Sequence, residues 1–160
     1  MKKTILLHIF LLTLLISCKD FDFAMDYESG IEIKNKSNHL IGLYIGVKEY
    51  NVEYIYPDTL LPSTNKHIKY DISKILRPGT YLPPKREREF FKELPKDTLS
   101  IFIFSTDTLN KYSWEEIRRD YKILKRYDLS YEDCVRLNFI VPYPPTPTMS
   151  RMKMYPKYGR

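Results

Sequence analysis

The stretch Thr98-Leu99-Ser100-Ile101-Phe102-Ile103-Phe104 is the strongest strand signal in the sequence, because it joins β-branched and aromatic residues to an almost wholly apolar end. Such a composition is typical of a central strand that is buried on both faces. The strongest helix signal comes soon after it. Ser113 and Glu116 fit an S-x-x-E capping box, and Trp114 and Ile117 then fall on one face of the helix. The sequence therefore predicts a buried central strand followed by one main helix near Trp114.

Alternating segments on the N-terminal side of this strand predict further strands. Residues 31–35 alternate apolar and polar side chains, and residues 40–47 form a second apolar run, with turn residues at 36–39 between them. We expect these two segments to form a β-hairpin. Residues 52–56 and 66–70 carry two more strand patterns.

The remaining elements are shorter. Residues 123–127 and 137–141 predict strands, and Ser130 begins a helical turn that runs to Leu137. The charge pattern at residues 85–94 predicts a short helix with one apolar side.

Strands outnumber helices in this pattern, so we expect a mainly β or α+β domain. Its form would be a small β-sandwich or a curled mixed sheet, with the main helix near Trp114 and the short helix around residues 85–94 packed on it. Residues 30–143 are expected to form this single globular domain. Residues 144–160 are expected to form a Pro-rich basic tail that is extended and frays from Met149 onward.

The first residues of the chain have the layout of a secretory signal. Met1-Lys2-Lys3 is a positive start, and residues 5–16 form an apolar run with no acidic residue before Asp20. A transmembrane helix needs about 20 apolar residues, and this run is shorter. We therefore expect a signal peptide and not a permanent membrane span.

The end of the run, Leu15-Ile16-Ser17-Cys18, resembles a bacterial lipobox, in which a small residue precedes a cysteine. The resemblance implies that residues 1–17 are removed and that the sulfur of Cys18 receives a diacylglycerol thioether. Several acyl chains on one residue hold a small protein on a bilayer almost irreversibly. Residues 18–29 would then be the lipid anchor and tether, and the membrane would be the first partner.

The residues after the cysteine bear on location. Lys19-Asp20-Phe21-Asp22 resembles the lysine and acidic stretch that directs lipoproteins of the Bacteroidota to the cell surface, although Phe21 interrupts the acidic run. A solvated tether explains the same residues equally well. We expect a lipid-anchored protein of the cell envelope, at the outer membrane, with exposure at the cell surface as an open alternative.

Charge is distributed unevenly along the chain. The sequence has 26 basic and 20 acidic side chains, and loss of Lys2 and Lys3 with the signal peptide would leave 24 against 20, a net charge of +4. Four basic residues lie in the last ten positions: Arg151, Lys153, Lys157 and Arg160. Because a nucleic-acid groove needs basic side chains clustered on the folded body, we expect no nucleic-acid partner.

Cysteine usage leaves one free thiol. With Cys18 acylated, only Cys134 remains, so no disulfide can form within the chain. Cys134 could serve as a catalytic thiol. Its helical spacing from Leu137 favours a buried structural residue, since free cysteine is among the most buried residue types.

Catalytic and metal-binding patterns are weak throughout. His39 and His67 have no second metal-type ligand at helical or strand spacing, and the five glycines form no phosphate-binding loop, so no metal or cofactor is expected. Two carboxylates could still meet in the fold as in glycoside hydrolases. The candidates sit near Lys or Arg, which favours solvated, salt-bridged surfaces. These are Glu87, Glu89, Glu93, Glu115 and Glu116.

Tyrosine is the one residue type that leans toward a function. The chain has 14 tyrosines, and Tyr50, Tyr54, Tyr56 and Tyr70 fall on or beside predicted strands. They could form a surface that stacks on sugar rings or on a partner's side chains. Half-buried packing is the more common role of tyrosine in strands.

A tripeptide occurs three times, as Asp58-Thr59-Leu60, Asp97-Thr98-Leu99 and Asp107-Thr108-Leu109. It resembles the Asp-Thr-aliphatic acceptor sites of protein O-glycosylation in Bacteroidota envelope proteins. Ordinary turn and cap residues give the same pattern. Of the three, Thr59 and Thr108 are expected in loops and are the better candidates.

Together, the lipobox, these tripeptides and the segment from Tyr112 to Ser130 resemble the small uncharacterised lipoproteins of gut Bacteroidota. The resemblance implies no activity for the folded part. Two interpretations remain. The first is a non-catalytic binding module for a glycan or protein partner, and the second is a small envelope hydrolase whose acidic residues converge only in the fold. The first is favoured, so the chain is not expected to be an enzyme.

Overall fold

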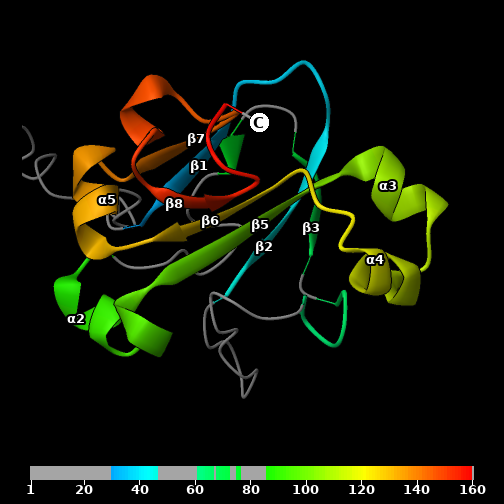
Figure 1. Ribbon diagram of the computed structural model, residues 1–160, viewed down its shortest axis with the longest axis horizontal. Coiled ribbons are helices and arrows are strands. Elements are labelled where there is room, and N and C mark those ends of the chain that lie inside the picture. Colours follow the sequence, from blue (N-terminus) through cyan, green and yellow to red (C-terminus); the bar gives the residue numbers. More distant parts are fainter. Residues whose placement is uncertain (1–29, 47–60, 67, 73–74, 77–85, 160) are drawn as a thin grey trace, which may run out of the picture.

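The computed structural model describes residues 30–46, 61–66, 68–72, 75–76 and 86–159, and within them the fold is α+β with two sheets (Figure 1). The smaller sheet has the order β4-β1-β7, and the larger has the order β3-β2-β5-β6-β8. The strands are β1 (Glu32–Asn35), β2 (Ile41–Ile45), β3 (Lys69–Ile72), β4 (Ile75–Leu76), β5 (Leu99–Ser105), β6 (Lys125–Leu129), β7 (Ile140–Tyr143) and β8 (Lys153–Tyr155).

The helices are short and lie at two ends of the larger sheet (Figure 1). At one end are α2 (Arg88–Lys92) and α5 (Tyr131–Arg136), and at the other are α3 (Thr106–Lys111) and α4 (Trp114–Asp120). Two 3₁₀ turns complete the described elements: η2 (Pro95–Asp97) and η3 (Pro147–Met149). The small mixed fold, the helix near Trp114 and the short helix within residues 85–94 confirm the predictions.

Strand β5 is the centre of the larger sheet, as predicted. It pairs antiparallel with β2 on one side and β6 on the other, and all its residues except Ser105 are buried. Leu99, Ile101 and Ile103 face a core that also contains residues of β1 and β7. Because this core lies between the two sheets, we call it the joint core. Phe102 and Phe104 face the opposite side.

The second core lies under the α4 end of the molecule. Phe104 packs edge-to-face against Trp114, with ring centroids 5.8 Å apart, and Ile117 joins the same cluster. The indole N–H of Trp114 donates to the carbonyl of Pro62 at 3.0 Å. Helix α4 begins where expected because Ser113 and Glu116 form both halves of the capping box.

The predicted hairpin of residues 31–35 and 40–47 is wrong. Strand β1 pairs with β4 and, in parallel, with β7, whereas β2 belongs to the larger sheet. The Asn35 side chain is buried in the intervening turn, where it donates to the carbonyl of His39 and accepts from Ser37. Both strands send apolar side chains into the joint core. Alternation identifies the buried face of a strand but not its partner, so it could not separate a hairpin from a change of sheet.

The expectation that the chain frays from Met149 onward is also wrong. Strand β8 pairs antiparallel with β6, and Met149, Met152 and Met154 are buried in the joint core. The folded domain therefore continues beyond residue 143. The Pro-rich and basic composition favoured a disordered tail, and the strand β8 is too short for its alternation of exposed and buried side chains to outweigh that signal.

The other expected elements are found with shifted bounds. The strands predicted at 123–127, 137–141 and 66–70 correspond to β6, β7 and β3, and the helical turn after Ser130 is α5. The strand predicted at 52–56 lies outside the described residues.

Candidate binding surface

The tyrosine surface expected from the sequence remains a prediction. Tyr50, Tyr54 and Tyr56 lie outside the described residues, and Tyr70 falls in β3, an edge strand of the larger sheet. A different pair of tyrosines meets on the described part of the chain.

The pair is Tyr121, which ends α4, and Tyr155, which lies on β8. Strands β6 and β8 set the surroundings of Tyr155. Tyr127 lies opposite Met154 in the register of the two strands, and both side chains belong to the joint core. Because side chains alternate across a strand, the neighbours of these residues lie on the other face of the sheet. There Arg126 lies opposite Tyr155, and Asp128 lies opposite Lys153.

Hydrogen bonds connect these side chains in a chain of contacts. The Asp128 carboxylate accepts from Arg126 Nε at 3.1 Å and from the Ser100 hydroxyl at 3.1 Å. Arg126 Nη1 donates to the Tyr121 hydroxyl at 2.7 Å. The Tyr121 and Tyr155 rings then meet edge-to-face, with centroids 5.6 Å apart and planes at 68°. We call Tyr121, Arg126, Asp128, Lys153 and Tyr155 the Tyr155 patch.

Exposure decreases along the contacts that run from Tyr155 to Asp128, whereas Lys153 is exposed. Tyr155 is 50% exposed, the Arg126 side chain is 13% exposed, and the Asp128 side chain is fully covered. Burial raises the pKa of Tyr121, and the neighbouring guanidinium of Arg126 only partly opposes that effect. Tyr121 is therefore a neutral hydrogen-bond partner at physiological pH.

The backbone at Tyr121 adds a further feature. Tyr121 ends α4 in the left-handed conformation, with φ 52° and ψ 48°. Helices commonly end with glycine in this conformation, because a side chain there is strained by about 1–3 kcal/mol. The contacts to Arg126 and Tyr155 hold the Tyr121 ring in place despite this cost.

Cys134 is the buried residue that the sequence favoured. It lies on α5 with no exposed surface, and burial, with a smaller contribution from Asp133, raises the pKa of its thiol to about 12. A thiol with this pKa holds almost no thiolate at neutral pH, and the thiolate is the reactive form.

In a Cys18→Ala variant, Cys134 is expected to resist Ellman's reagent at about pH 8 while the protein is folded, and to react fully once it is unfolded in guanidinium. Val135 is the next residue and is 47% exposed, so a Val135→Cys variant is a matched control that should react in the folded state. Rapid modification of Cys134 in the folded protein would contradict a sealed thiol.

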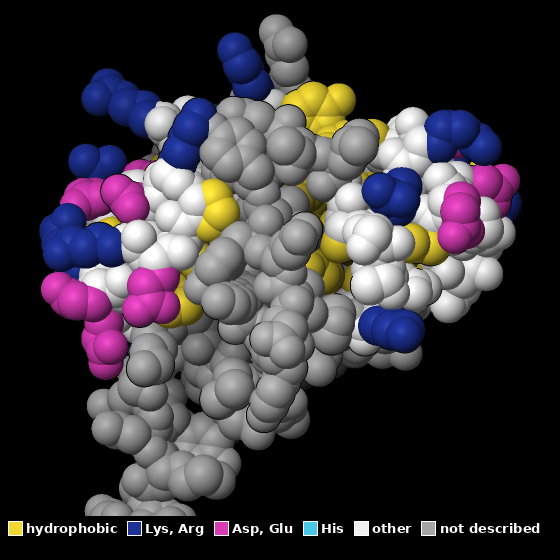
Figure 2. Space-filling model, turned by 90° about the horizontal axis from the view of Figure 1, so that it is seen from below, with side chains coloured by type: hydrophobic (Ala, Val, Ile, Leu, Met, Phe, Trp, Pro, Cys, Tyr) yellow, Lys and Arg dark blue, Asp and Glu magenta, His cyan; other side chains and the backbone are white. Residues whose placement is uncertain are grey.

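The candidate carboxylates are engaged in local structure or exposed. Glu116 accepts from the backbone N–H and the hydroxyl of Ser113, and these bonds lower its pKa. Glu89 pairs with Lys92 at 3.7 Å. Glu87, Glu93 and Glu115 are exposed. On the face shown in Figure 2, acidic side chains lie among Lys and Arg at both ends of the molecule, the pattern of solvated ion pairs.

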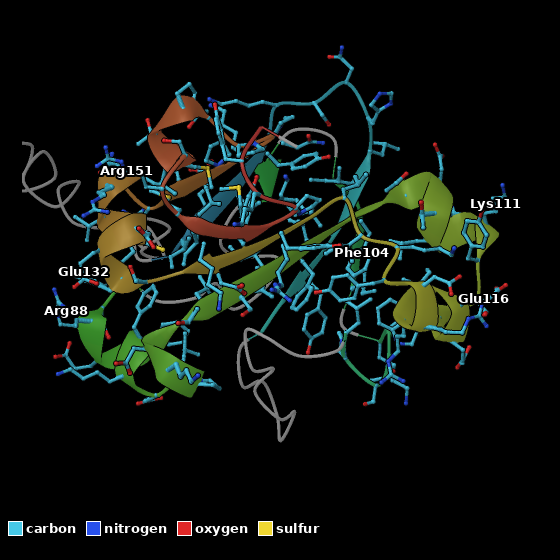
Figure 3. The ribbon with its side chains drawn as sticks, viewed as in Figure 1. Arg88, Phe104, Lys111, Glu116, Glu132 and Arg151 are labelled. Atoms are coloured by element: carbon cyan, nitrogen blue, oxygen red, sulfur yellow. The ribbon has the colours of Figure 1, made fainter. Side chains whose placement is uncertain are left out.

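One further ion pair connects the helices at one end. Arg88 of α2 and Glu132 of α5 point toward each other (Figure 3) and lie 2.6 Å apart, and the Arg88 guanidinium sits 4.3 Å from the centre of the Tyr131 ring. The hydrogen bond from Arg88 is the main cause that lowers the pKa of Glu132. This pair joins α2 to α5.

The remaining candidates are the two histidines and the two threonines of the Asp-Thr-Leu segments. His39 is exposed in the turn before β2, as expected, and His67 lies outside the described residues. Thr108 was expected in a loop but is half-buried within α3, and Thr59 lies outside the described residues. In the part of the chain that the structure describes, no three His, Cys, Asp or Glu side chains are grouped to hold a metal ion.

The lipid-attachment residue Cys18 also lies outside the described residues. None of the described helices is long and apolar enough to cross a bilayer.

Sequence reasoning missed the Tyr155 patch for an identifiable reason. Lys153-Met154-Tyr155 alternates as a half-buried strand does, but it is only three residues long and follows a Pro-rich segment. Comparison of the chain with protein-family models, with curated proteins and with solved structures finds no match.

Proposed function

We propose that the chain is an envelope lipoprotein, tethered to the outer membrane through the lipid on Cys18, whose folded domain is a non-catalytic binding module that contacts its partner through the Tyr155 patch. The observation that carries the binding role is the half-exposed Tyr155 ring, held edge-to-face by Tyr121. Tyrosine is enriched at the centres of binding surfaces because it offers a large apolar area and a polar hydroxyl.

The surroundings of Tyr155 favour this role. Arg126 fixes Tyr121, and Asp128 fixes Arg126, so the ring rests on side chains that are already ordered. A side chain that is ordered before binding loses less conformational entropy when a ligand arrives. The patch is therefore suited to binding without rearrangement.

The chemistry of the described residues favours binding over hydrolysis. A general acid needs a carboxyl group with a raised pKa. The carboxylates of Glu116 and Glu132 have lowered pKa values, because each accepts hydrogen bonds that favour its charged form. Asp128 is held against Arg126, and the Cys134 thiol is sealed.

The membrane tether is supported by the sequence. The positive start, the apolar run of residues 5–16 and the cysteine after Ser17 form a continuous signal of the lipoprotein type. The described residues begin at Gly30, and residues 18–29 before them would serve as the tether.

The tether predicts the mass of the mature protein. Protein purified from the membrane fraction is expected to have the mass of a chain that begins at Cys18 and carries a diacylglycerol group with or without an amide-linked acyl chain. A Cys18→Ala variant should lack that modification and keep the signal segment or lose it at another site. Intact-mass spectrometry of the two proteins makes the comparison, and a wild-type chain that keeps residues 1–17 or carries no lipid would refute the tether.

A further inference from the structure

Gly30, the first described residue, lies at the end of the domain that carries α2 and α5. Arg86 Nε donates to the carbonyl of Gly30 at 2.8 Å, and the Arg86 guanidinium lies 5.4 Å from the centre of the Phe139 ring. The backbone N–H of Glu32 donates to the carbonyl of Phe139 at 2.8 Å. These contacts place the residue that follows the proposed tether beside Phe139, between α5 and β7.

A partly exposed aromatic surface lies at the same place. The Tyr131 and Phe139 rings have centroids 6.0 Å apart, and the Arg88 guanidinium lies 4.3 Å from the centre of the Tyr131 ring. Val135 follows Tyr131 by four positions on α5, so the two side chains are neighbours on the helix surface. Val135 is 47% exposed. We call Arg86, Arg88, Tyr131, Val135 and Phe139 the α5 face.

Ion pairs among the described residues of α2 and α5 cancel much of the charge around this face. They are Arg88–Glu132 at 2.6 Å, Lys92–Glu89 at 3.7 Å and Arg136–Asp133 at 3.6 Å. Glu87 and Glu93 are also exposed beside α2, so this end carries no excess of basic side chains. A contact made here would therefore depend on the apolar and aromatic side chains and not on attraction to anionic groups.

We propose that the α5 face rests on the surface of the bilayer to which the lipid on Cys18 anchors the chain. Val135 and the rings of Tyr131 and Phe139 enter the boundary between headgroups and acyl chains, and the two arginines lie at the level of the headgroups. The inference rests on the proposed function, because the lipid tether is what brings the bilayer to this face.

The length and end point of the tether favour the bilayer as the occupant. Residues 18–29 can span at most about 40 Å, because each residue of an extended chain adds no more than about 3.3–3.6 Å. Gly30 is held at the α5 face by Arg86, so this face stays close to the anchored lipid. A tethered surface meets its partner at a high effective concentration. A small apolar surface, too weak to bind vesicles by itself, is then sufficient.

The side chains of the α5 face suit a membrane interface. Aromatic rings with a polar edge, such as tyrosine, are enriched at the level of the headgroups. Arginine extends an apolar stem along such a surface and keeps its charged end in water. On the α5 face both kinds of side chain occur together, since each guanidinium lies over an aromatic ring.

This orientation leaves the Tyr155 patch accessible to a partner. Strand β6 starts on the α4 side and leads into α5, and Arg126, which lies opposite Tyr155, is near its start. Figure 3 shows Lys111 and Glu116 at the end of the molecule opposite to Arg88 and Glu132. With the α5 face on the bilayer, the end that carries α3 and α4 points away from it.

Fluorescence quenching by lipid, measured on the lipidated full-length protein in phosphatidylcholine vesicles, tests the proposal. An environment-sensitive NBD group is attached to a Val135→Cys variant. Its emission is expected to lie at shorter wavelength than in water, and a phospholipid with a doxyl group near the top of its acyl chain should quench it. Protein without an introduced cysteine should take up no label, because the lipid occupies Cys18 and Cys134 is buried.

A matched position at the far end of the molecule provides the control. Glu115 is exposed on α4, so an NBD group on a Glu115→Cys variant should emit as it does in water and escape the doxyl lipid. Quenching at position 135 should stay the same when phosphatidylglycerol or salt is added, because the contact does not depend on net charge. Thermal melts establish that each labelled variant is folded.

Two outcomes would overturn the α5 face as the membrane contact. They are equal quenching at positions 135 and 115, and quenching at position 135 that disappears at high salt. Failure of the proposed function gives a different signal, because an intact mass without lipid removes the tether and this inference with it. A lipidated chain whose position 135 is not quenched refutes only the contact and leaves the tether in place.

Discussion

Deletion of residues 144–160 is expected to unfold the domain, although these residues have the composition of a tail. The deletion removes β8 from the edge of the larger sheet and takes Met149, Met152 and Met154 out of the joint core. Burying one methionine side chain is worth about 1.5–3 kcal/mol, and a whole domain is stable by only about 5–15 kcal/mol. The shortened chain should give no cooperative transition in urea followed by circular dichroism.

A polar contact adds to this effect. Most of the Lys125 side chain is buried, and its ammonium donates to the carbonyl of Pro156 at 2.9 Å in a partly buried hydrogen bond. Burial lowers the pKa of Lys125. Removing the C-terminal segment takes away that acceptor and leaves Lys125 facing an opened core. When a charged donor loses its acceptor but stays partly covered, the loss is costly, because water does not fully replace the hydrogen bond.

Point variants separate the core contribution from nonspecific effects of truncation. Met149→Ala is expected to lower the free energy of unfolding by about 2–5 kcal/mol. Thr148 is exposed beside it, and Thr148→Ala should change that free energy by less than about 0.5 kcal/mol. A shortened chain that melts like the wild type, or equal effects of the two point variants, would show that the segment is not part of the core.

The elements that were predicted correctly have local causes. Strand β5 is buried on both faces, so its apolar run was visible without knowledge of its partners. Helix α4 begins at a capping box formed by Ser113 and Glu116, two residues three positions apart. The buried state of Cys134 followed from its place on a short helix and from the general behaviour of free cysteine.

The elements that were missed depend on distant partners. The packing of the two sheets decides whether β1 pairs with β2 or with β7. The alternation of apolar and polar residues in β1 would be the same with either partner, so it could not predict the pairing. The Tyr155 patch requires the register between β6 and β8, which are separated by the whole of α5 and β7. It also requires the left-handed backbone at Tyr121, a conformation for which the sequence offered no glycine or asparagine.

Asp128→Ala is expected to cause the largest loss of stability of any single charge change in the described part of the chain, about 3–5 kcal/mol. The carboxylate is fully covered and holds both Arg126 Nε and the Ser100 hydroxyl. Its removal leaves the guanidinium, itself only 13% exposed, without this counter-charge. Taking one member from a covered ion pair costs far more than the pair contributes, because the remaining charge has lost its water as well.

Two comparisons make this result specific to the covered pair. Asp120 also contacts an arginine, at 2.8 Å, but its side chain is 37% exposed, so Asp120→Ala is expected to lose much less stability. Replacing both partners, with Arg126→Met and Asp128→Leu, should recover part of the loss because no unpaired charge remains. Urea unfolding of the three variants and the wild type supplies the free energies. If Asp128→Ala were no worse than Asp120→Ala, Asp128 would not be the support on which Arg126, Tyr121 and the exposed Tyr155 ring rest.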